Sequence, residues 1–154
     1  MSAFVIAPLP LRAGSLALSP LPADGRARAM VTRFAPALVV SMTETAEMAG
    51  LGAADLPEWL TAQGIRWLHF PVADYQTPPA NADWRSLSAQ VHAALAPGAR
   101  VLLHCRGGLG RSGMVALRLM IEAGEDPDRA LARLRAARPG AVETPQQEAW
   151  ARQP

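Results

Sequence analysis

The 154-residue sequence contains no lysine and only one cysteine, Cys105. A Walker-type phosphate loop needs a lysine, so that class of nucleotide site is excluded. A lone cysteine excludes an internal disulfide and a cysteine-based zinc site, and it suits a reducing compartment. The amino end carries neither a charged start nor a long apolar run. We therefore expect no signal peptide, transmembrane helix or membrane anchor, and a cytoplasmic location.

The chain also lacks any basic run. Its 15 arginines are spread along the sequence and the net charge is only +2, which argues against binding to nucleic acid or to a membrane surface. The three histidines have no acidic partners at ligand spacing, so His69 and His92 are interpreted as structural. We expect no metal and no cofactor.

Half of the residues are hydrophobic and 18% are charged, which is typical of a soluble globular protein, and we expect residues 1–154 to form a single domain. The apolar patterns predict strands at residues 4–6, 15–18, 37–41, 65–70 and 99–103. They predict helices at residues 26–34, 43–49, 84–95, 112–122 and 127–137, with others capped by Asp55 and Thr144. Alternating strands and helices indicate an α/β fold: an open, mostly parallel central sheet of about five strands with helices on both faces.

The most informative stretch runs from His104 to Gly113. It follows a strand-like run and leads into a helix-like run, and three glycines lie between Cys105 and Arg111. Such a turn aims backbone N–H groups at one spot and adds the positive end of a helix dipole, which makes an oxyanion cradle. A cysteine at its base is expected to sit as a thiolate near neutral pH, and the arginine can clamp a phosphate with a bidentate fork. The pattern predicts a site that cleaves phosphate esters.

Two other interpretations fit parts of this stretch. A single cysteine is often only a small buried hydrophobic residue. Residues 108–113 also spell G-x-G-x-x-G, the dinucleotide-binding fingerprint, between a strand and a helix. That fingerprint needs a second strand ending in an acidic residue about 20 positions later. Here the chain continues into another helical stretch, which disfavours a nucleotide cofactor.

The run His-Cys, five residues, Arg-Ser resembles the signature loop of the protein tyrosine phosphatase superfamily. Its form and the chain length resemble the small dual-specificity branch, including the kinase-associated phosphatase type. The resemblance implies a phosphatase fold in which Cys105 is the nucleophile, Arg111 clamps the phosphate, Ser112 supplies a hydroxyl to the thiolate, and His104 tunes the cysteine. It implies that the phosphate is bound by Arg106, Gly107, Gly108, Leu109, Gly110 and Arg111.

Two further loops resemble parts of the same family. Residues 71–79 follow a strand and hold a single carboxylate, Asp74, which resembles the general acid; the alternative is an aspartate that merely caps a turn, with Glu44 and Asp83 as the next candidates for the acid. Residues 138–147 resemble the glutamine loop that positions the hydrolytic water. Gln147 matches its second glutamine, whereas Glu143 stands where the first is expected.

The implied activity is hydrolysis of phosphate monoesters, phosphotyrosine and also phosphoserine or phosphothreonine on proteins, through a cysteinyl-phosphate. The expected partner is therefore a phosphorylated protein or a small phosphate ester. Alternatives left open are a phosphatase for lipid or nucleotide phosphates, and a phosphate-binding module without turnover. Sulfur transfer would not need the arginine as placed, and arsenate reduction normally needs a second thiol. No tyrosine-bearing recognition loop is evident, so we expect a shallow pocket.

Overall fold

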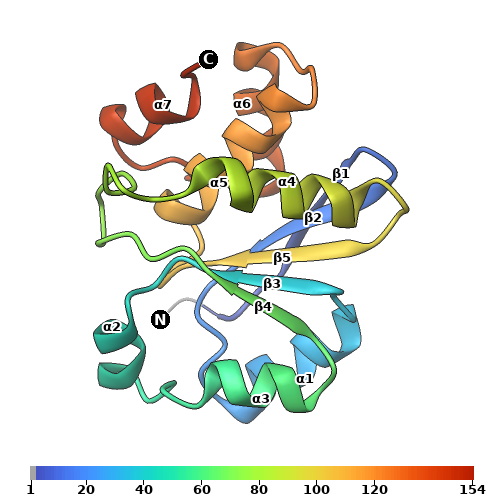
Figure 1. The fold of residues 1–154 in the computed structure, drawn as a ribbon, viewed down its shortest axis with the longest axis vertical. Helices are drawn as coiled ribbons and strands as arrows, with labels where there is room; N and C mark the ends of the chain where they lie inside the picture. The colour runs from blue at the N-terminus through green and yellow to red at the C-terminus, as the bar shows by residue number, and fades with distance from the viewer. Residues whose placement is uncertain (1–2) are drawn as a thin grey trace.

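The computed structural model describes residues 3–154 (Figure 1). Along the chain the elements are β1 (Ala7–Leu11), β2 (Gly14–Ser19), α1 (Gly25–Phe34), β3 (Leu38–Ser41), α2 (Thr45–Gly50), α3 (Leu56–Ala62), β4 (Arg66–His69), α4 (Trp84–Leu95), β5 (Arg100–His104), α5 (Gly110–Glu122), α6 (Pro127–Ala137) and α7 (Pro145–Ala151). The order of strands and helices is the one predicted from the sequence.

The five strands form one sheet in the order β1-β2-β5-β3-β4. Only β1 runs antiparallel to its neighbour, while the β2–β5, β5–β3 and β3–β4 pairs are parallel. This confirms the predicted open, mostly parallel sheet. Strand β5 lies in its centre, and Val101, Leu102 and Leu103 are fully buried, as expected for a strand covered on both faces.

Helices cover both faces of the sheet, as predicted. Figure 1 shows α4, α5, α6 and α7 on one side and α1, α2 and α3 on the other. Each layer buries its own apolar cluster against the sheet: Val91 and Leu117 belong to the larger cluster, and Val31 and Leu60 to the smaller one. Burial of side chains of this size stabilises the fold by roughly 1.5–3 kcal/mol each, so the two layers hold the sheet edge rigid.

The position of the first strand differs from the prediction. Residues 4–6 are not a strand; β1 begins at Ala7 and pairs with β2 from Ala7↔Leu18 to Leu11↔Gly14. Pro8 and Pro10 are exposed while Leu9 and Leu11 are buried. A proline cannot donate to a sheet ladder, but it is tolerated on an edge strand whose N–H side faces solvent. The edge position therefore explains how a proline-rich segment forms a strand.

One predicted helix cap and one helix start also differ from the prediction, although α3 does follow Asp55 as predicted. Asp55 precedes α3, but within the described structure its carboxylate does not cap the helix; it forms a bidentate ion pair with Arg28 at 2.8 and 3.0 Å. Helix α5 begins at Gly110 rather than at Ser112, because the turn of the loop closes earlier than the apolar pattern indicates. The Thr144 cap is confirmed, since its Oγ1 accepts a hydrogen bond from Gln147 N at 3.0 Å.

The carboxyl ends of the parallel strands meet at one edge of the sheet. Ser41 at the end of β3 is in register with His69 at the end of β4 and with His104 at the end of β5. In Figure 1 this edge lies on the left, beneath the long loop that joins β4 to α4. Loops at this edge are where ligands bind in open α/β sheets.

Candidate active site

The loop of residues 105–109 joins β5 to α5 and wraps around the sulfur of Cys105. The Gly108 N–H group donates to Cys105 Sγ at 3.2 Å, and the cysteine is only 3% exposed. Gly108 has a φ of +74°, and a Cβ atom there would lie 2.4 Å from the carbonyl carbon of Ser19. Only glycine fits this close approach with a left-handed backbone, so the sequence requires glycine for the loop to close over the sulfur.

Arg111 lies in the first turn of α5 and is 1% exposed. Its Nη1 and Nη2 atoms donate to the two carboxylate oxygens of Glu47 at 2.8 and 2.7 Å, and Nη1 also donates to the carbonyl of Val72 at 2.9 Å. Burial acts to lower the pKa of the Arg111 guanidinium, but Glu47 first, and then the nearby Cys105 and Asp74, raise it above its ordinary value. The hydrogen bonds to Glu47 and Val72 thus fix the position of the positively charged Arg111 guanidinium.

Two polar groups beside the cysteine are buried without a hydrogen-bond partner among residues 3–154: Arg111 Nε and Ser112 Oγ. An unpaired buried donor costs roughly 1–3 kcal/mol, so such groups in a native fold mark a position for something else. Because both belong to the turn that carries the positive end of α5, the group that fits is an anion.

His104 is fully buried and forms part of a chain of hydrogen bonds. Its Nδ1 lies 3.1 Å from the carbonyl oxygen of Cys105, and its Nε2 contacts Ser41 Oγ. Ser41 Oγ in turn accepts from Trp67 Nε1 at 2.8 Å. Since a carbonyl only accepts, the Nδ1 atom carries the proton, and Nε2 accepts the Ser41 hydroxyl proton. Burial, the largest cause, lowers the pKa of His104 to about 4, so the ring stays neutral and keeps this tautomer.

This burial predicts a stability change with pH. The unfolded histidine takes up a proton near its ordinary pKa of 6.5, whereas the folded one resists until about 4. Stability is therefore full above pH 7 and falls as the pH is lowered. We expect His104 to contribute a loss of about 2 kcal/mol in unfolding free energy between pH 7 and pH 5. Urea unfolding of wild type and His104→Gln at the two pH values measures it; equal pH slopes for the two proteins would contradict the neutral histidine.

Asp74 lies in the loop between β4 and α4 and reaches the cysteine loop. Its Oδ1 is 3.1 Å from Arg111 Nη2, and its side chain is 40% exposed. The same oxygen accepts the N–H of Tyr75 at 3.1 Å, and Tyr75 has a φ of +63°. A left-handed backbone at a bulky residue is strained. This turn thus places a second carboxylate beside the Arg111 Nη2 atom that also binds Glu47.

The loop before α7 brings Glu143 and Gln147 to the same place. Gln147 is fully buried; its Oε1 accepts from the N–H groups of Glu143 and Thr144 at 3.0 and 3.2 Å, and its Nε2 donates to the carbonyl of Gln76 at 3.2 Å. Gln147 thus links this loop to the Asp74 loop. Burial, and then the charge of Asp74, raise the pKa of the Glu143 carboxyl, which faces the Gly110 amide.

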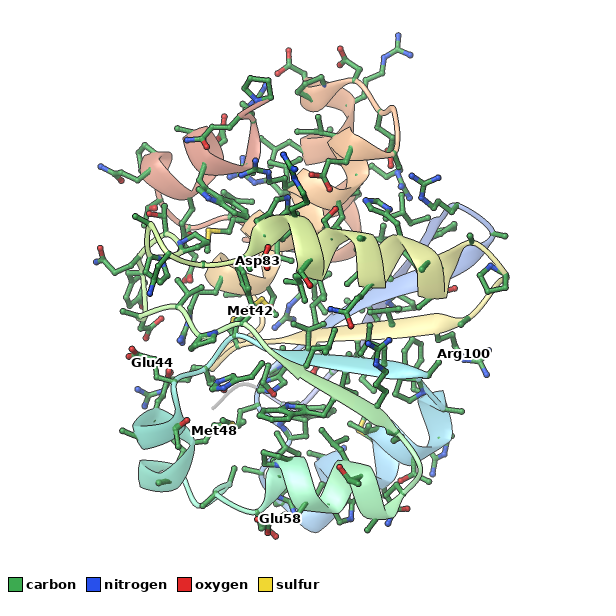
Figure 2. All side chains as sticks on the ribbon, viewed as in Figure 1. Met42, Glu44, Met48, Glu58, Asp83 and Arg100 are labelled. Carbon is green, nitrogen blue, oxygen red and sulfur yellow. The ribbon has the colours of Figure 1, made fainter. Side chains whose placement is uncertain are left out.

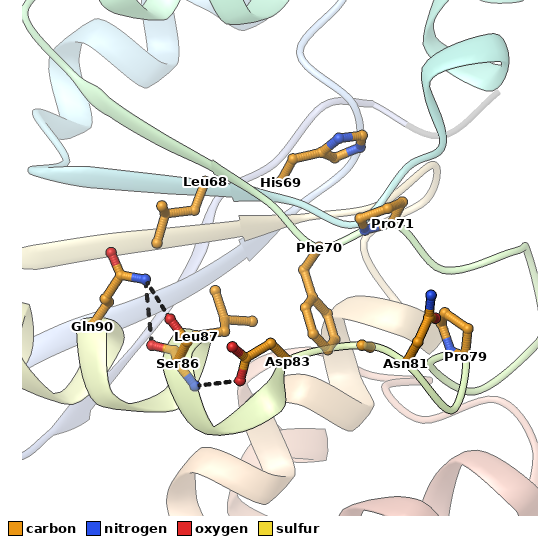
Figure 3. Close-up of a pocket in the computed structure, with 11 residues that line it drawn as sticks. Leu68, His69, Phe70, Pro71, Pro79, Asn81, Asp83, Ser86, Leu87 and Gln90 are labelled. Carbon is orange, nitrogen blue, oxygen red and sulfur yellow. Dashed lines mark hydrogen bonds between the residues drawn. The ribbon is translucent and has the colours of Figure 1, made fainter.

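The other candidate acids stand at the starts of helices, and the Glu44 N–H donates to Glu47 Oε1 at 3.2 Å. Asp83 caps α4 by accepting from Ser86 N at 3.0 Å, and Glu44 precedes α2 on the opposite face of the sheet (Figure 2). Asp83 also lines a separate hollow of about 360 Å³ between β4 and α4, together with Leu68, Phe70 and Gln90 (Figure 3). No residue of the loop from Cys105 to Arg111 lines this hollow.

The remaining histidines have structural partners. His69 Nε2 lies 2.7 Å from the Thr43 carbonyl and His92 pairs with Glu122 at 3.2 Å. Within residues 3–154, no three His, Cys, Asp or Glu side chains are grouped as metal ligands. In the same range, no helix has both the length and the apolar character needed to cross a membrane.

Sequence reasoning missed two residues of the site. Glu47 was read only as part of a short helix, and Arg138 only as part of a loop. Arg138 donates to the carbonyls of Gly107 and Gly108 at 2.8 and 3.2 Å. The sequence does contain one indication for Glu47. It lies shortly after β3, and the carboxyl end of β3 is at the same edge of the sheet as the end of β5, which Cys105 follows.

The family model described as "Swiss Army Knife protein, DSP-PTPase phosphatase domain" matches residues 35–151. Among curated proteins, none matches the sequence.

Several solved structures share the fold. Kinase associated phosphatase, with its catalytic-site cysteine replaced by serine, is 22% identical over 99% of this chain and 94% of its own, with a TM-score of 0.87. Tk-PTP in its active form is 34% identical over 88% of this chain and 87% of its own, with a TM-score of 0.74. PTPMT1 in complex with PI(5)P is 19% identical over 94% of this chain and 92% of its own, with a TM-score of 0.76.

Proposed function

Because this chain belongs to the DSP-PTPase phosphatase family, the small dual-specificity branch of the protein tyrosine phosphatase superfamily, we propose that it hydrolyses phosphate monoesters through a phosphate bound covalently to Cys105. The proposed substrates are phosphotyrosine and phosphoserine or phosphothreonine on proteins. We further propose that the chain acts as one phosphatase domain, which is supported by two core clusters on a shared sheet, and that it works in the cytoplasm, where its single thiol stays reduced.

The observation that carries the proposal is the inventory of N–H groups on Arg111. A guanidinium has five. Glu47 and Val72 take three of them and Asp74 faces a fourth, while Nε has no partner within the described chain. The edge formed by Nε and Nη2 is therefore the one that a phosphate can take in bidentate fashion. Binding there displaces Asp74 from Nη2, which frees its carboxyl to approach the leaving oxygen.

In the first step, the Cys105 thiolate attacks phosphorus, an S–P bond forms and the P–O bond to the leaving group breaks. The proton donor is Asp74, which hands its proton to the departing oxygen. Backbone N–H groups from Arg106 to Arg111 and the Arg111 fork stabilise the charge on the equatorial oxygens. His104 orients the start of the loop through the Cys105 carbonyl.

In the second step, water attacks the cysteinyl-phosphate and Asp74, now ionised, accepts its proton. The S–P bond breaks and inorganic phosphate forms. Ser112 and the Gly108 N–H, which already lies 3.2 Å from the sulfur, ease the return of the thiolate. Glu143 and Gln147 are the proposed water-positioning pair: the Glu143 carboxyl faces the Gly110 amide, and Gln147 fixes the Glu143 backbone. No step calls for a metal or a cofactor.

A substrate panel tests the proposal: an activated aryl phosphate, phosphotyrosine and phosphoserine peptides, a phosphoinositide in micelles and a nucleoside monophosphate, each in the presence of a chelator. We expect the aryl phosphate and the phosphotyrosine peptide to be hydrolysed fastest. If the phosphoinositide or the nucleotide were hydrolysed fastest, the proposed mechanism would stand, but the proposed substrate class would change from proteins to lipids or nucleotides. If the protein bound phosphate but hydrolysed none of the five substrates, the proposal that it is an enzyme would be contradicted.

Replacement of Asp74 by asparagine is expected to lower kcat/KM by about 10²- to 10⁴-fold for phosphoserine and alkyl phosphates, which need a protonated leaving group. The loss with an activated aryl phosphate should be far smaller, since its phenolate leaves unaided. The fall in rate at high pH should also disappear, because it reports loss of the acid proton. Steady-state kinetics across leaving groups and pH measure both effects.

Asp83→Asn is the matched control, because it changes a carboxylate of the same connecting segment that caps α4 instead. It should leave the dependence on leaving group unchanged. A uniform loss in Asp74→Asn across all leaving groups, with an unaltered pH profile, would mean that Asp74 only shapes its loop.

A further inference from the structure

The orientation of the peptide groups in the loop of residues 105–109 depends on what holds their carbonyls. In a trans peptide the C=O of one residue and the N–H of the next point in opposite directions. An N–H group can therefore be fixed toward the sulfur only if the preceding carbonyl is fixed away from it. A loop with two adjacent glycines, Gly107 and Gly108, has little intrinsic preference for one orientation, so these outer partners decide whether the cradle exists before an anion arrives.

Three of the five carbonyls are held by partners other than Arg138. The Cys105 carbonyl lies 3.1 Å from His104 Nδ1. Leu21 N donates to the Arg106 carbonyl at 3.1 Å, and Val142 N donates to the Leu109 carbonyl at 3.0 Å. The N–H groups that follow these three carbonyls are thereby turned to the inner side of the loop.

The two remaining carbonyls belong to Gly107 and Gly108, and a single side chain holds both. Arg138 Nη2 donates to the Gly107 carbonyl at 2.8 Å and Arg138 Nε donates to the Gly108 carbonyl at 3.2 Å. The N–H group that follows the Gly107 carbonyl is that of Gly108, which faces Cys105 Sγ at 3.2 Å. The outer and inner hydrogen bonds thus point in opposite directions from the same peptide group.

Arg138 is itself fixed by the segment of residues 138–142, here called the strap. Arg138 directly follows α6, and its carbonyl accepts from Ala141 N at 3.0 Å. Arg135 donates to the Ala141 and Val142 carbonyls at 2.9 and 3.1 Å. Gly113 leaves room for the strap, because a Cβ atom there would lie 2.5 Å from Val142 N. Because the strap is fixed in place, the planar guanidinium of Arg138 can hold two carbonyls in one orientation.

We propose that Arg138 is a positioning residue: its side chain pre-orients the Gly107–Gly108 and Gly108–Leu109 peptides, and so sets the oxyanion affinity of the Cys105 loop without contacting the substrate. This inference rests on the proposed function only in taking phosphate as the anion. Its role is separate from that of Arg111, whose guanidinium faces the anion from within α5.

The test compares Arg138→Met with Arg129→Met, both prepared in wild type and in the Cys105→Ser background. Arg129 is an exposed arginine on α6, the helix that Arg138 directly follows, so its replacement removes the same charge from a nearby part of the chain. Inorganic phosphate binding is measured by calorimetry in the serine background, and kcat/KM for an aryl phosphate in the wild-type background. We expect Arg138→Met to weaken both by about 10- to 10²-fold, with Arg129→Met within two-fold of its parent.

Two further variants separate positioning from folding. Arg138→Lys keeps the charge but can reach only one carbonyl at a time, so its phosphate affinity should fall between those of arginine and methionine. Arg138→Ala leaves space for a free guanidinium ion, and millimolar guanidinium should restore activity to this variant while leaving Arg129→Ala unchanged. A purely structural arginine would not respond to added guanidinium.

Phosphate affinity and kcat/KM within two-fold of the Arg129→Met control would overturn the proposal, as would a lysine variant equal to arginine or an absence of guanidinium rescue. Failure of the proposed function would look different. In that case wild type would hydrolyse none of the esters, whereas the effect of Arg138 on phosphate binding in the serine background would remain measurable.

Discussion

The Cys105→Ser variant is expected to lose at least about 10⁴-fold in kcat on every substrate. A serine hydroxyl is not ionised at neutral pH, and the neighbouring His104 is not free to remove its proton, since its Nδ1 proton lies on the Cys105 carbonyl and its Nε2 on Ser41. Phosphate affinity should be retained or rise, because the backbone amides and Arg111 remain while the negative thiolate is removed. Stopped assays for hydrolysis and calorimetry with inorganic phosphate measure the two effects.

Circular dichroism and urea unfolding serve as controls that the serine variant keeps the fold. The substitution is nearly isosteric at a position only 3% exposed, so little change in stability is expected. Activity of the serine variant within ten-fold of wild type, with no contaminating enzyme, would be incompatible with a sulfur nucleophile.

Arg111→Lys is expected to lower kcat/KM by at least about 10²- to 10³-fold, the scale seen when one transition-state donor is removed. Lysine carries a point charge and cannot present the Nε and Nη2 edge to a phosphate while holding Glu47 with a second edge. It would also leave Glu47 with a poorer partner in a pair that is only 1% exposed on the arginine side. Inorganic phosphate should bind more weakly in the same variant.

Arg118→Lys is the matched control for that change. Arg118 lies on the same helix, half-buried, where its guanidinium stacks on Trp150 at 4.5 Å and donates to the Trp150 carbonyl at 3.3 Å. Its replacement should reduce stability through lost packing while leaving kcat/KM close to wild type. Equal losses of kcat/KM in Arg111→Lys and Arg118→Lys would contradict the proposal that Arg111 binds the phosphate.

The sequence predicted the parts of the site that are local. Residues 104–113 contain the end of β5, the turn and the start of α5, and their order alone places a sulfur, backbone amides and an arginine together. The fold class was equally accessible, because the central strands are continuous apolar runs and the helices have one apolar face.

The contacts that complete the site join residues distant in the sequence. Glu47 and Arg111 are 64 positions apart, and Gln147 meets the Gln76 carbonyl across 71 positions. A carboxylate on the short helix after β3 has many possible partners, so its place near the carboxyl edge does not by itself identify Arg111 as the partner of Glu47. Arg138 is one of 15 arginines in the sequence. Its contacts depend on the orientation of the Gly107 and Gly108 carbonyls, and the residue types alone do not predict that orientation.

The strand error has a related cause. Local preference disfavours prolines in strands, and the tertiary position of β1 at the sheet edge overrides it. The alternation of exposed prolines with buried Leu9 and Leu11 was the signal that a period-two pattern was present.

The covalent intermediate is the central claim, and rapid quenching tests it most directly. Wild-type enzyme in excess is mixed with an activated aryl phosphate that carries a radiolabel on phosphorus, quenched in acid within the first turnover, and digested for peptide mapping. With this leaving group, formation of the S–P bond outpaces its hydrolysis, so label should accumulate on the peptide that contains Cys105 and then decay to inorganic phosphate at the rate of turnover. Release of the aryl alcohol at the full rate with no label on Cys105, or with label on another residue, would contradict the account.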